Sequence, residues 1–123
     1  MRCKTIAVAK NLKSTFGLTG LHVVGRQEQG ELVNNVHRVA VACGSGGSFM
    51  ERAIQSGCDA FVTGESNFHT ALEASARDIT LILLGHFASE RFAVEVLADK
   101  LSNEFTDVEV WASQQESDPL IWV

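Results

Sequence analysis

The strongest constraint on the fold is the regular alternation of apolar runs with helical patterns from residue 36 onward. The apolar runs are 36–44, 58–64 and 79–85, and the helical segments that follow them are 48–56, 66–77 and roughly 87–105. The runs are almost continuously apolar, as expected of strands that helices cover on both faces. Because the strand–helix connections are short, the sequence predicts a three-layer α/β domain with a mostly parallel sheet.

The segments around this core are less regular. Residues 4–16 have the periodicity of an amphipathic helix, residues 21–24 predict a short strand, and the polar segment 25–35 predicts a loop. Residues 108–112 alternate apolar and polar side chains, which predicts a last strand at or near a sheet edge. With 123 residues, of which 46% are hydrophobic, the chain has material for one core, so we expect a single domain over 1–123.

Composition argues against several classes of function. The net charge is −5 and no Lys/Arg cluster interrupts the acidity, so a nucleic-acid-binding face is not expected. No apolar run approaches the ~18 residues of a membrane span, and the N-terminus is too weakly apolar for a signal peptide. The odd cysteine count, without CxxC spacing, favours a reducing compartment, so we expect a cytoplasmic protein. Cys43 and Cys58 lie in apolar runs and are interpreted as buried small side chains.

Distinctive residues follow each of the three predicted inner strands. They are Cys43–Ser48, Thr63–Ser66 and Gly85–His86. In open parallel sheets, ligands bind outside the carboxyl ends of the strands, so these segments are expected at one rim. The spacing of Ser48 and Glu51 predicts a capping box, which favours a tight turn into the next helix. A contact of Gly46 and Gly47 with an anion or substrate remains the alternative.

His86 and Glu90 are the most specific candidates for functional residues in the sequence. On a helix they share a face with Val94, Leu97 and Leu101, which we expect in the core. A carboxylate aimed at a core is costly unless it is paired or binds a metal. In one interpretation, Glu90 complements the helix dipole and His86 is a hydrogen-bonded helix-start residue. In the other, both are ligands of Zn, Mn, Fe or Ni, with further ligands from elsewhere.

Three ordered motifs carry a family resemblance. GSGGSF (44–49), DAFVTGE (59–65) and GHFASER (85–91) together resemble the C-terminal half of the NIF-three-like family of dinuclear-metal-centre proteins, often labelled GTP cyclohydrolase type-one-like. The resemblance covers about residues 4–113. It implies an α/β fold of two related halves, assembled as a ring-shaped hexamer, with two metal ions in a cleft between the halves.

The resemblance also assigns roles to individual residues. His86 and Glu90 match the family's GHxxxE segment and are carried over as metal ligands. Glu65 and His69 match the TGE…H segment, and we carry them over as candidate contacts of the ligands or of the substrate. Taken by themselves, Glu65 and His69 are more simply explained as a local helical pair.

The family's remaining metal ligands, an adjacent His pair and an Asp, belong to its N-terminal half, which this sequence lacks. The chain is then either part of a longer protein or a half-size relative that completes, or has lost, its site at a subunit interface. In either case His86 and Glu90 would point into the cleft between the halves, on a face that is exposed here or covered by another subunit.

Three functional hypotheses follow. The first is a metal-binding domain of this family, with metal-activated water attacking a nucleotide-like or phosphate-bearing substrate. The second is a non-catalytic homo-oligomerisation module in which His86 and Glu90 are a relic. The third is a small anion- or nucleotide-binding domain that uses 44–48, against which the predicted capping box argues.

Overall fold

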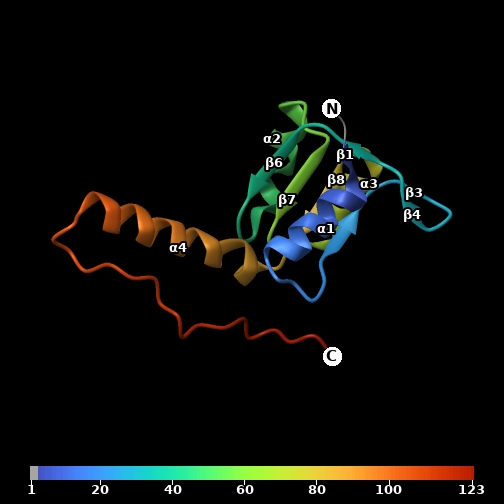
Figure 1. Ribbon diagram of the computed structural model, residues 1–123. Helices are drawn as coiled ribbons and strands as arrows, with labels where there is room; N and C mark the ends of the chain where they lie inside the picture. Colours follow the sequence, from blue (N-terminus) through green and yellow to red (C-terminus); the bar gives the residue numbers. More distant parts are fainter. Residues whose placement is uncertain (1–2) are drawn as a thin grey trace.

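The structure, a computed structural model, describes residues 3–123 (Figure 1). The strands are β1 (Cys3–Lys4), β2 (His22–Val24), β3 (Gln27–Glu28), β4 (Glu31–Leu32), β5 (Asn35–Val36), β6 (Val39–Ala42), β7 (Ala60–Thr63) and β8 (Thr80–Leu83). The helices are α1 (Thr5–Thr15), the 3-10 turn η1 (Gly46–Phe49), α2 (Met50–Gln55), α3 (Phe68–Ala76) and α4 (His86–Glu104).

The central sheet has four strands in the order β2-β8-β7-β6. β7 lies parallel to both of its neighbours, with Val62 opposite Val41 on β6 and opposite Ile82 on β8. β2 pairs antiparallel with β8 and forms one edge. The predicted α/β class with a mostly parallel sheet is confirmed, and the antiparallel edge strand makes the sheet mixed.

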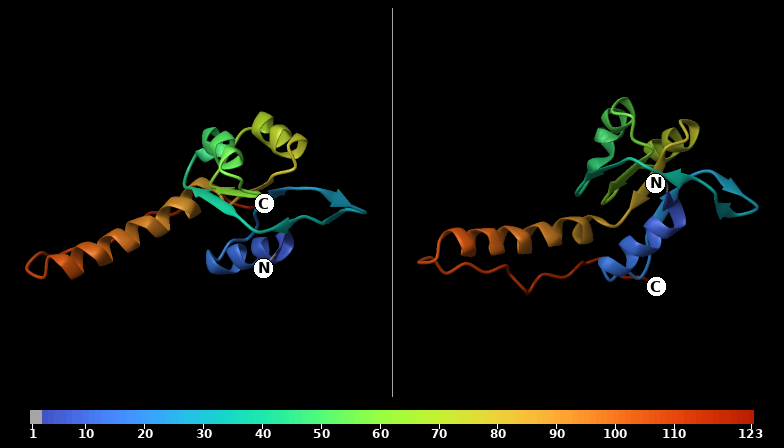
Figure 2. Two further views of the ribbon diagram at one scale, coloured as in Figure 1. Left: turned by 90° about the horizontal axis from the view of Figure 1, so that it is seen from above. Right: turned by 45° about the horizontal axis from the view of Figure 1, so that its top comes forward.

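Helices cover both faces of this sheet, as predicted (Figure 2). On one face, Val62 and Ile82 pack with Val8 and Leu12 of α1. On the other face, buried residues of the sheet, α2, α3 and the turn before β8 form the larger core cluster. Its members are Met50, Ala53, Phe61, Ala74, Ile79 and Leu81. The apolar runs at 58–64 and 79–85 are therefore strands buried on both faces, as their composition predicted.

The run at 36–44 is different, because it supplies an edge strand. β6 begins only at Val39, and the backbone N–H groups of His37 and Arg38 donate to the carboxylate of Asp59 instead of joining the sheet. Val41 is 70% exposed and Cys43 is also exposed, so the prediction of a buried Cys43 was wrong. Apolar composition alone does not distinguish this edge strand from the buried ones.

The predicted loop at 25–35 contains more structure than expected. β3 and β4 form a small hairpin, and β5 pairs antiparallel with β1. Each of these strands has only two residues, which is too short for a periodicity to appear in the sequence.

The prediction that Val94, Leu97 and Leu101 lie in the core was wrong. α4 leaves the sheet and extends away from the body of the molecule (Figures 1 and 2). The three side chains are 47%, 56% and 38% exposed. Their helical spacing places them on one face of α4, and no segment in the described range 3–123 buries that face.

The predicted strand at 108–112 is also wrong, because this segment has no strand partner within the described residues. The tail after α4 instead runs back beside that helix toward the body (Figure 2). The guanidinium of Arg91 and the hydroxyl of Ser102 donate to backbone carbonyls of the tail. Near its end, Trp122 lies against Gly20 and its ring centroid is 6.2 Å from that of His22.

The capping box predicted for Ser48 and Glu51 does not form. Phe49 occupies the N-cap of α2 without a side-chain hydrogen bond, and Ser48 belongs to η1. The Glu51 carboxylate contacts Gln55 and Arg77 instead, which links α2 to the end of α3. The turn is tight, as favoured, but its glycines and hydroxyl contacts hold it. None of the helices described over residues 3–123 is long and apolar enough to span a membrane.

Candidate functional site

The segments that follow β6, β7 and β8 meet at one rim of the sheet, as the parallel order requires. The carbonyl oxygen of Gly44 accepts hydrogen bonds from the N–H groups of Gly64 and Glu65, at 3.1 and 3.0 Å. The Gly64 carbonyl in turn accepts from Gly85 N–H at 2.8 Å. The three chain segments that carry the family motifs therefore form one hydrogen-bonded unit.

Two buried hydroxyls hold this unit together. Thr63, which is 1% exposed, accepts from the N–H of Gly46 and donates to the carbonyl of Gly44, at 3.0 and 3.1 Å. Ser89 accepts from the N–H of Gly44 and donates to the carbonyl of His86, both at 2.9 Å. The glycine-rich turn is thereby fixed to β7 and to the first turn of α4. Sequence reasoning assigned no role to Thr63 or Ser89.

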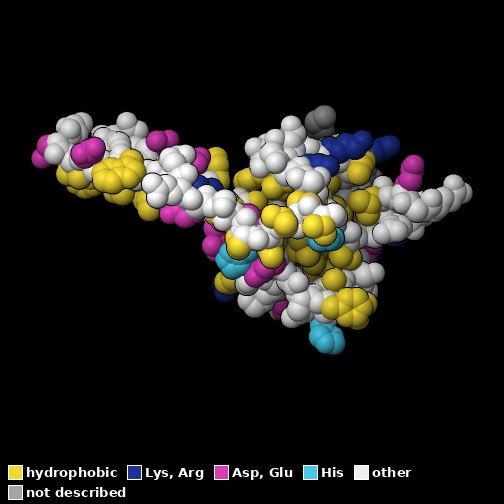
Figure 3. Space-filling view, turned by 90° about the horizontal axis from the view of Figure 1, so that it is seen from below, with side chains coloured by type: hydrophobic (Ala, Val, Ile, Leu, Met, Phe, Trp, Pro, Cys, Tyr) yellow, Lys and Arg dark blue, Asp and Glu magenta, His cyan; other side chains and the backbone are white. Residues whose placement is uncertain are grey.

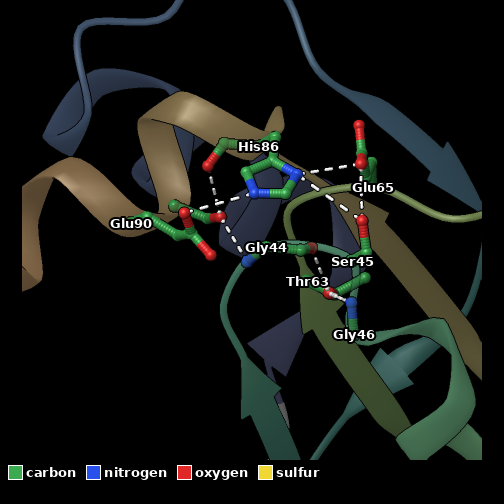
Figure 4. Close-up of polar contacts among 8 residues, drawn as sticks. Gly44, Ser45, Gly46, Thr63, Glu65, His86 and Glu90 are labelled. Carbon is green, nitrogen blue, oxygen red and sulfur yellow. Dashed lines mark hydrogen bonds and ion pairs between the residues drawn. The ribbon is translucent and has the colours of Figure 1, made fainter.

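The imidazole of His86 lies between two carboxylates (Figure 4). Its Nδ1 atom is 2.8 Å from Oε1 of Glu65, and its Nε2 atom is 3.2 Å from Oε2 of Glu90. The hydroxyl of Ser45 donates to the same Glu65 oxygen at 2.6 Å. Glu65 comes from the loop after β7 and Glu90 from α4, so the ring is aligned by two separate elements.

The contacts between His86 and the two carboxylates favour the charged forms of His86 and Glu65. The hydrogen bond that His86 donates to Glu65 raises the pKa of His86, and the nearby charge of Glu90 raises it further. Conversely, the hydrogen bonds from Ser45 and from His86 lower the pKa of Glu65. The three side chains are half-exposed, at 45% for His86, 51% for Glu65 and 53% for Glu90. Solvent therefore screens the pairs, and their main effect is to orient the ring.

The backbone of the glycine-rich turn approaches this group closely. Gly44 has a φ of +63°, and a Cβ at this position would lie 2.3 Å from Oε1 of Glu90. Both the left-handed backbone and the close carboxylate require glycine here. The backbone of the turn therefore lies directly against the side chains of Glu90 and His86.

The side chains of His86 and Glu90 are of the types that bind divalent transition metals, but two ligands are too few for a complete shell. An imidazole Nε2 and a carboxylate oxygen on one helix face are typical ligands of Zn, Mn, Fe or Ni. Within residues 3–123, however, no group of three or more His, Cys, Asp or Glu side chains is arranged to hold an ion. His86 and Glu90 could therefore contribute two ligands to such an ion, which is fewer than the three or four of a usual protein shell.

Of the remaining candidate residues, Glu65, Gly46 and Gly47 lie at this rim. A Cβ on Gly46 would lie 2.4 Å from Oγ1 of Thr63, and one on Gly47 would lie 2.3 Å from Oγ of Ser66. His69 is exposed on α3, with its ring centroid 6.4 Å from that of Phe68. The predicted local pairing of Glu65 with His69 is not formed, because the Glu65 carboxylate bonds His86 and Ser45.

Two of the hollows beside the group bear on its chemistry. One, of about 510 Å³, lies between α4 and the tail and includes His86, Glu90, Arg91 and Leu120 in its lining. The other, of about 370 Å³, lies between the glycine-rich turn and α3, and every residue in its lining is polar or glycine. His86 and Glu90 therefore line the first hollow, and Glu65 lines the second.

Comparisons with known proteins agree with the motifs. Residues 2–119 match the protein-family model described as Duf34/NIF3 (NGG1p interacting factor 3). A Staphylococcus aureus protein named GTP cyclohydrolase 1 type 2 homolog is 33% identical over 119 residues, which is 94% of this chain and 31% of the relative. A Schizosaccharomyces pombe protein named Protein NIF3 homolog is 34% identical over 108 residues, which is 84% of this chain and 38% of the relative.

The fold has a counterpart among solved structures. The crystal structure of Staphylococcus aureus protein SA1388 superposes with a TM-score of 0.88 and 29% identity, covering 100% of this chain and 39% of that one. The chain thus spans about a third of the length of the relatives it matches.

Proposed function

Because this chain belongs to the DUF34/NIF3 family, we propose that it is a metal-binding domain of a metal-dependent hydrolase that acts on a nucleotide-like substrate. The observation that supports this proposal is the alignment of His86 and Glu90. The imidazole Nε2 and the carboxylate lie 3.2 Å apart on successive turns at the start of α4, and both side chains are half-exposed to solvent. A divalent ion at this face would take Nε2 of His86 and the carboxylate of Glu90 as ligands.

Glu65 has a distinct role in this proposal. If Nε2 binds the ion, Nδ1 carries the ring proton and donates a hydrogen bond to Glu65 Oε1, 2.8 Å away. Such carboxylate–histidine pairs fix the ring orientation and increase the basicity of the ligand. Ser45 holds the same carboxylate oxygen at 2.6 Å, so the orientation of the ring depends on the glycine-rich turn as well.

When bound, a divalent ion would supply Lewis acidity toward water or toward a polarised oxygen of the substrate. The chain's own residues would orient the ligand ring and keep a carboxylate close to it. Glu90 lies against both the ligand ring and the backbone of the glycine-rich turn. The substrate class is proposed from the name that the Staphylococcus aureus relative carries, which includes GTP cyclohydrolase.

The missing ligands are proposed to come from the polypeptide that covers α4. Glu90 shares a helix face with Val94, Leu97 and Leu101, and that face is apolar and uncovered. A segment packed there would exclude water beside His86 and Glu90 and would be in position to add side chains to the shell. We propose that the covering polypeptide belongs to the same assembly, either a further part of a full-length protein or another subunit of a homo-oligomeric ring.

Metal content tests this proposal. The purified chain is dialysed against Zn²⁺, Mn²⁺, Fe²⁺ or Ni²⁺ and measured by elemental analysis, beside His86→Ala and Glu90→Ala. We expect both substitutions to remove most of the bound metal. His69→Ala is the matched control, because this imidazole is exposed on α3 away from the pair. Full metal retention in His86→Ala would exclude the assignment.

The exposed side chains favour a second candidate function, that of a non-catalytic oligomerisation module. Large apolar side chains are exposed along α4 and the tail, and Figure 3 shows them on the arm and on the adjoining body. They include Phe92, Val94, Leu97, Phe105, Trp111 and Ile121. Exposed apolar surface of this extent marks an interaction site. A chain that assembles but binds no metal would support this candidate over the first.

A further inference from the structure

The polar hollow beside His86 has a lining of uniform chemistry. It lies between the glycine-rich turn, the loop after β7 and the start of α3, and has a volume of about 370 Å³. The lining residues are Ser45, Gly47, Ser48, Glu65, Ser66, Asn67 and Thr70. Four of the seven carry hydroxyls, one an amide and one a carboxylate, and no Lys, Arg or large apolar side chain contributes. From the sequence, Glu65, Gly46 and Gly47 were the candidate ligand contacts in this region, and its hydroxyls were not.

Several of these polar groups have capacity left for a ligand. Asn67 uses its Oδ1 atom to accept from the backbone N–H and the hydroxyl of Thr70, which leaves its NH₂ group as a donor. Glu65 uses Oε1 for both Ser45 and His86, which leaves Oε2 as an acceptor. The Oγ atom of Ser66 is buried and has no hydrogen-bond partner within the described residues. An unpaired buried hydroxyl is costly, and a bound polar ligand that rearranged this lining would offset that cost.

The composition of the lining discriminates between ligand classes. An anion such as phosphate would face the Glu65 carboxylate without any cation in the lining to offset the repulsion. A flat apolar ring would leave the hydroxyls and the amide without partners. A polyhydroxyl ligand matches, because each of its hydroxyls can donate to a carboxylate and accept from an amide or hydroxyl. A carboxylate that accepts from a ribose hydroxyl is an established recognition mode in nucleotide-binding folds.

We propose that this hollow binds the neutral polyhydroxyl part of the substrate, a ribose-like ring carrying a cis-diol, with Glu65 Oε2 and Asn67 Nδ2 as its principal contacts. The proposal rests on the proposed hydrolase function for its place in a reaction, since Glu65 joins the hollow directly to His86 at 2.8 Å. A sugar held there would lie beside the ligand pair. Glu65 would then connect sugar binding to the orientation of the imidazole.

The test uses amide chemical shifts of the ¹⁵N-labelled chain titrated with methyl β-D-ribofuranoside. We expect the amides of 45–48 and 65–70 to shift with a dissociation constant of about 1–10 mM, as befits a few hydrogen bonds. The 2-deoxy analogue, which lacks the diol, is expected to bind roughly 2- to 10-fold more weakly. Inorganic phosphate is titrated in parallel as the competing ligand chemistry.

Variants assign the contacts. Ser48→Ala and Asn67→Asp are each expected to weaken ribofuranoside binding by roughly 2- to 10-fold. Asn67→Asp retains the oxygen that caps α3, so the helix start is preserved. Ser75→Ala is the matched control, because Ser75 is exposed on α3 outside the lining. Native-like spectra of each variant show that a loss of binding is not a loss of folding.

The outcomes separate this inference from the metal proposal. Glu90→Ala removes a proposed metal ligand that does not line the hollow, and we expect it to retain ribofuranoside binding. Two results would overturn the inference: phosphate shifts these amides while the ribofuranoside does not, or neither ligand moves them at tens of millimolar. In both cases, metal binding by the unaltered chain would still be decided independently by its metal content.

Discussion

His86 Nδ1 lies 2.8 Å from Glu65 Oε1, although the two residues are 21 positions apart in the sequence. The contact joins the end of β7 to the start of α4 and leaves Nε2 facing Glu90. The bond can form because Gly44 and Gly64 let three backbone segments meet without side chains between them: a Cβ on Gly64 would lie 2.7 Å from the carbonyl oxygen of Gly44. The geometry of the proposed ligand pair is therefore a consequence of the backbone of the rim.

The first prediction concerns Glu65→Gln. Since the hydrogen bond to Glu65 is the main cause of the raised pKa of His86, the substitution should lower that pKa toward 6.5. A raised pKa stabilises the folded chain below about pH 6.5 and loses this effect as pH rises through the folded-state value. In the metal-free chain, Glu65→Gln should therefore reduce stability at acidic pH more than at alkaline pH. Histidine NMR titration and urea unfolding at several pH values measure the two effects.

The same substitution should weaken metal binding by about 10- to 100-fold, because an orienting carboxylate is lost. Glu109→Gln is the control, since Glu109 is exposed beyond α4. If Glu65→Gln binds metal with unchanged affinity, Glu65 does not orient the ring of His86 for metal binding.

The second prediction concerns Thr63→Val, which keeps the side-chain shape and deletes the hydroxyl. The N–H of Gly46 and the carbonyl of Gly44 would lose their partner in a buried setting, at a cost of about 1–3 kcal/mol in the free energy of unfolding. Thr106→Val, at an exposed position after α4, should change that free energy little. Urea denaturation of the two variants compares them, and equal stabilities would show that the hydroxyl does not hold the turn.

The third prediction separates backbone strain from site geometry at Gly44. Alanine at Gly44 (φ +63°) or at Gly17 (φ +60°) must adopt a left-handed backbone, so both substitutions should cost about 1 kcal/mol of stability. A Cβ on Gly17 meets nothing within 4 Å, whereas one on Gly44 would displace the Glu90 carboxylate. Gly44→Ala alone should therefore abolish metal binding while the fold persists, as judged by circular dichroism and metal content. Equal metal binding by the two variants would contradict the proposed role of Glu90.

The fourth prediction concerns the apolar face of α4. Leu97 is 56% exposed on α4 and Leu72 is 51% exposed on α3, so the two leucines form a matched pair. If the α4 face packs against another subunit, Leu97→Asp should lower the mass measured by light scattering, and Leu72→Asp should not. Neither substitution should change the unfolding of the core, since both side chains are already exposed. A chain that is monomeric before any substitution would argue against association through this face.

Sequence patterns predicted the elements whose signals are local. β7 and β8 bury apolar residues on both faces, and α1, α3 and α4 have clear helical spacing, so their positions were predicted to within a few residues. The ladders of two residues, such as β3 with β4, are too short to show any periodicity. The tail at 108–112 alternates like a strand, but it has no sheet edge to join within the described residues.

The error at α4 has a different origin. The spacing of Val94, Leu97 and Leu101 predicted correctly that they share one helix face, but it predicted wrongly that this face lies in the core. Periodicity shows which side chains share a face, and it does not show what packs against that face. For the site, the spacing of His86 and Glu90 was visible in the sequence, whereas the contacts with Glu65, Ser45 and Ser89 depend on how separate loops meet.

At the centre of the proposed function, His86 binds a divalent metal through Nε2 while its protonated Nδ1 donates a hydrogen bond to Glu65. Long-range ¹H–¹⁵N NMR of the histidine rings during a Zn²⁺ titration tests it directly. We predict that the Nε2 resonance of His86 shifts with added Zn²⁺, that Nδ1 keeps the shift of a protonated nitrogen, and that His69 does not respond. A His86 ring that is unchanged by Zn²⁺, or one that takes the metal at Nδ1, would contradict the account.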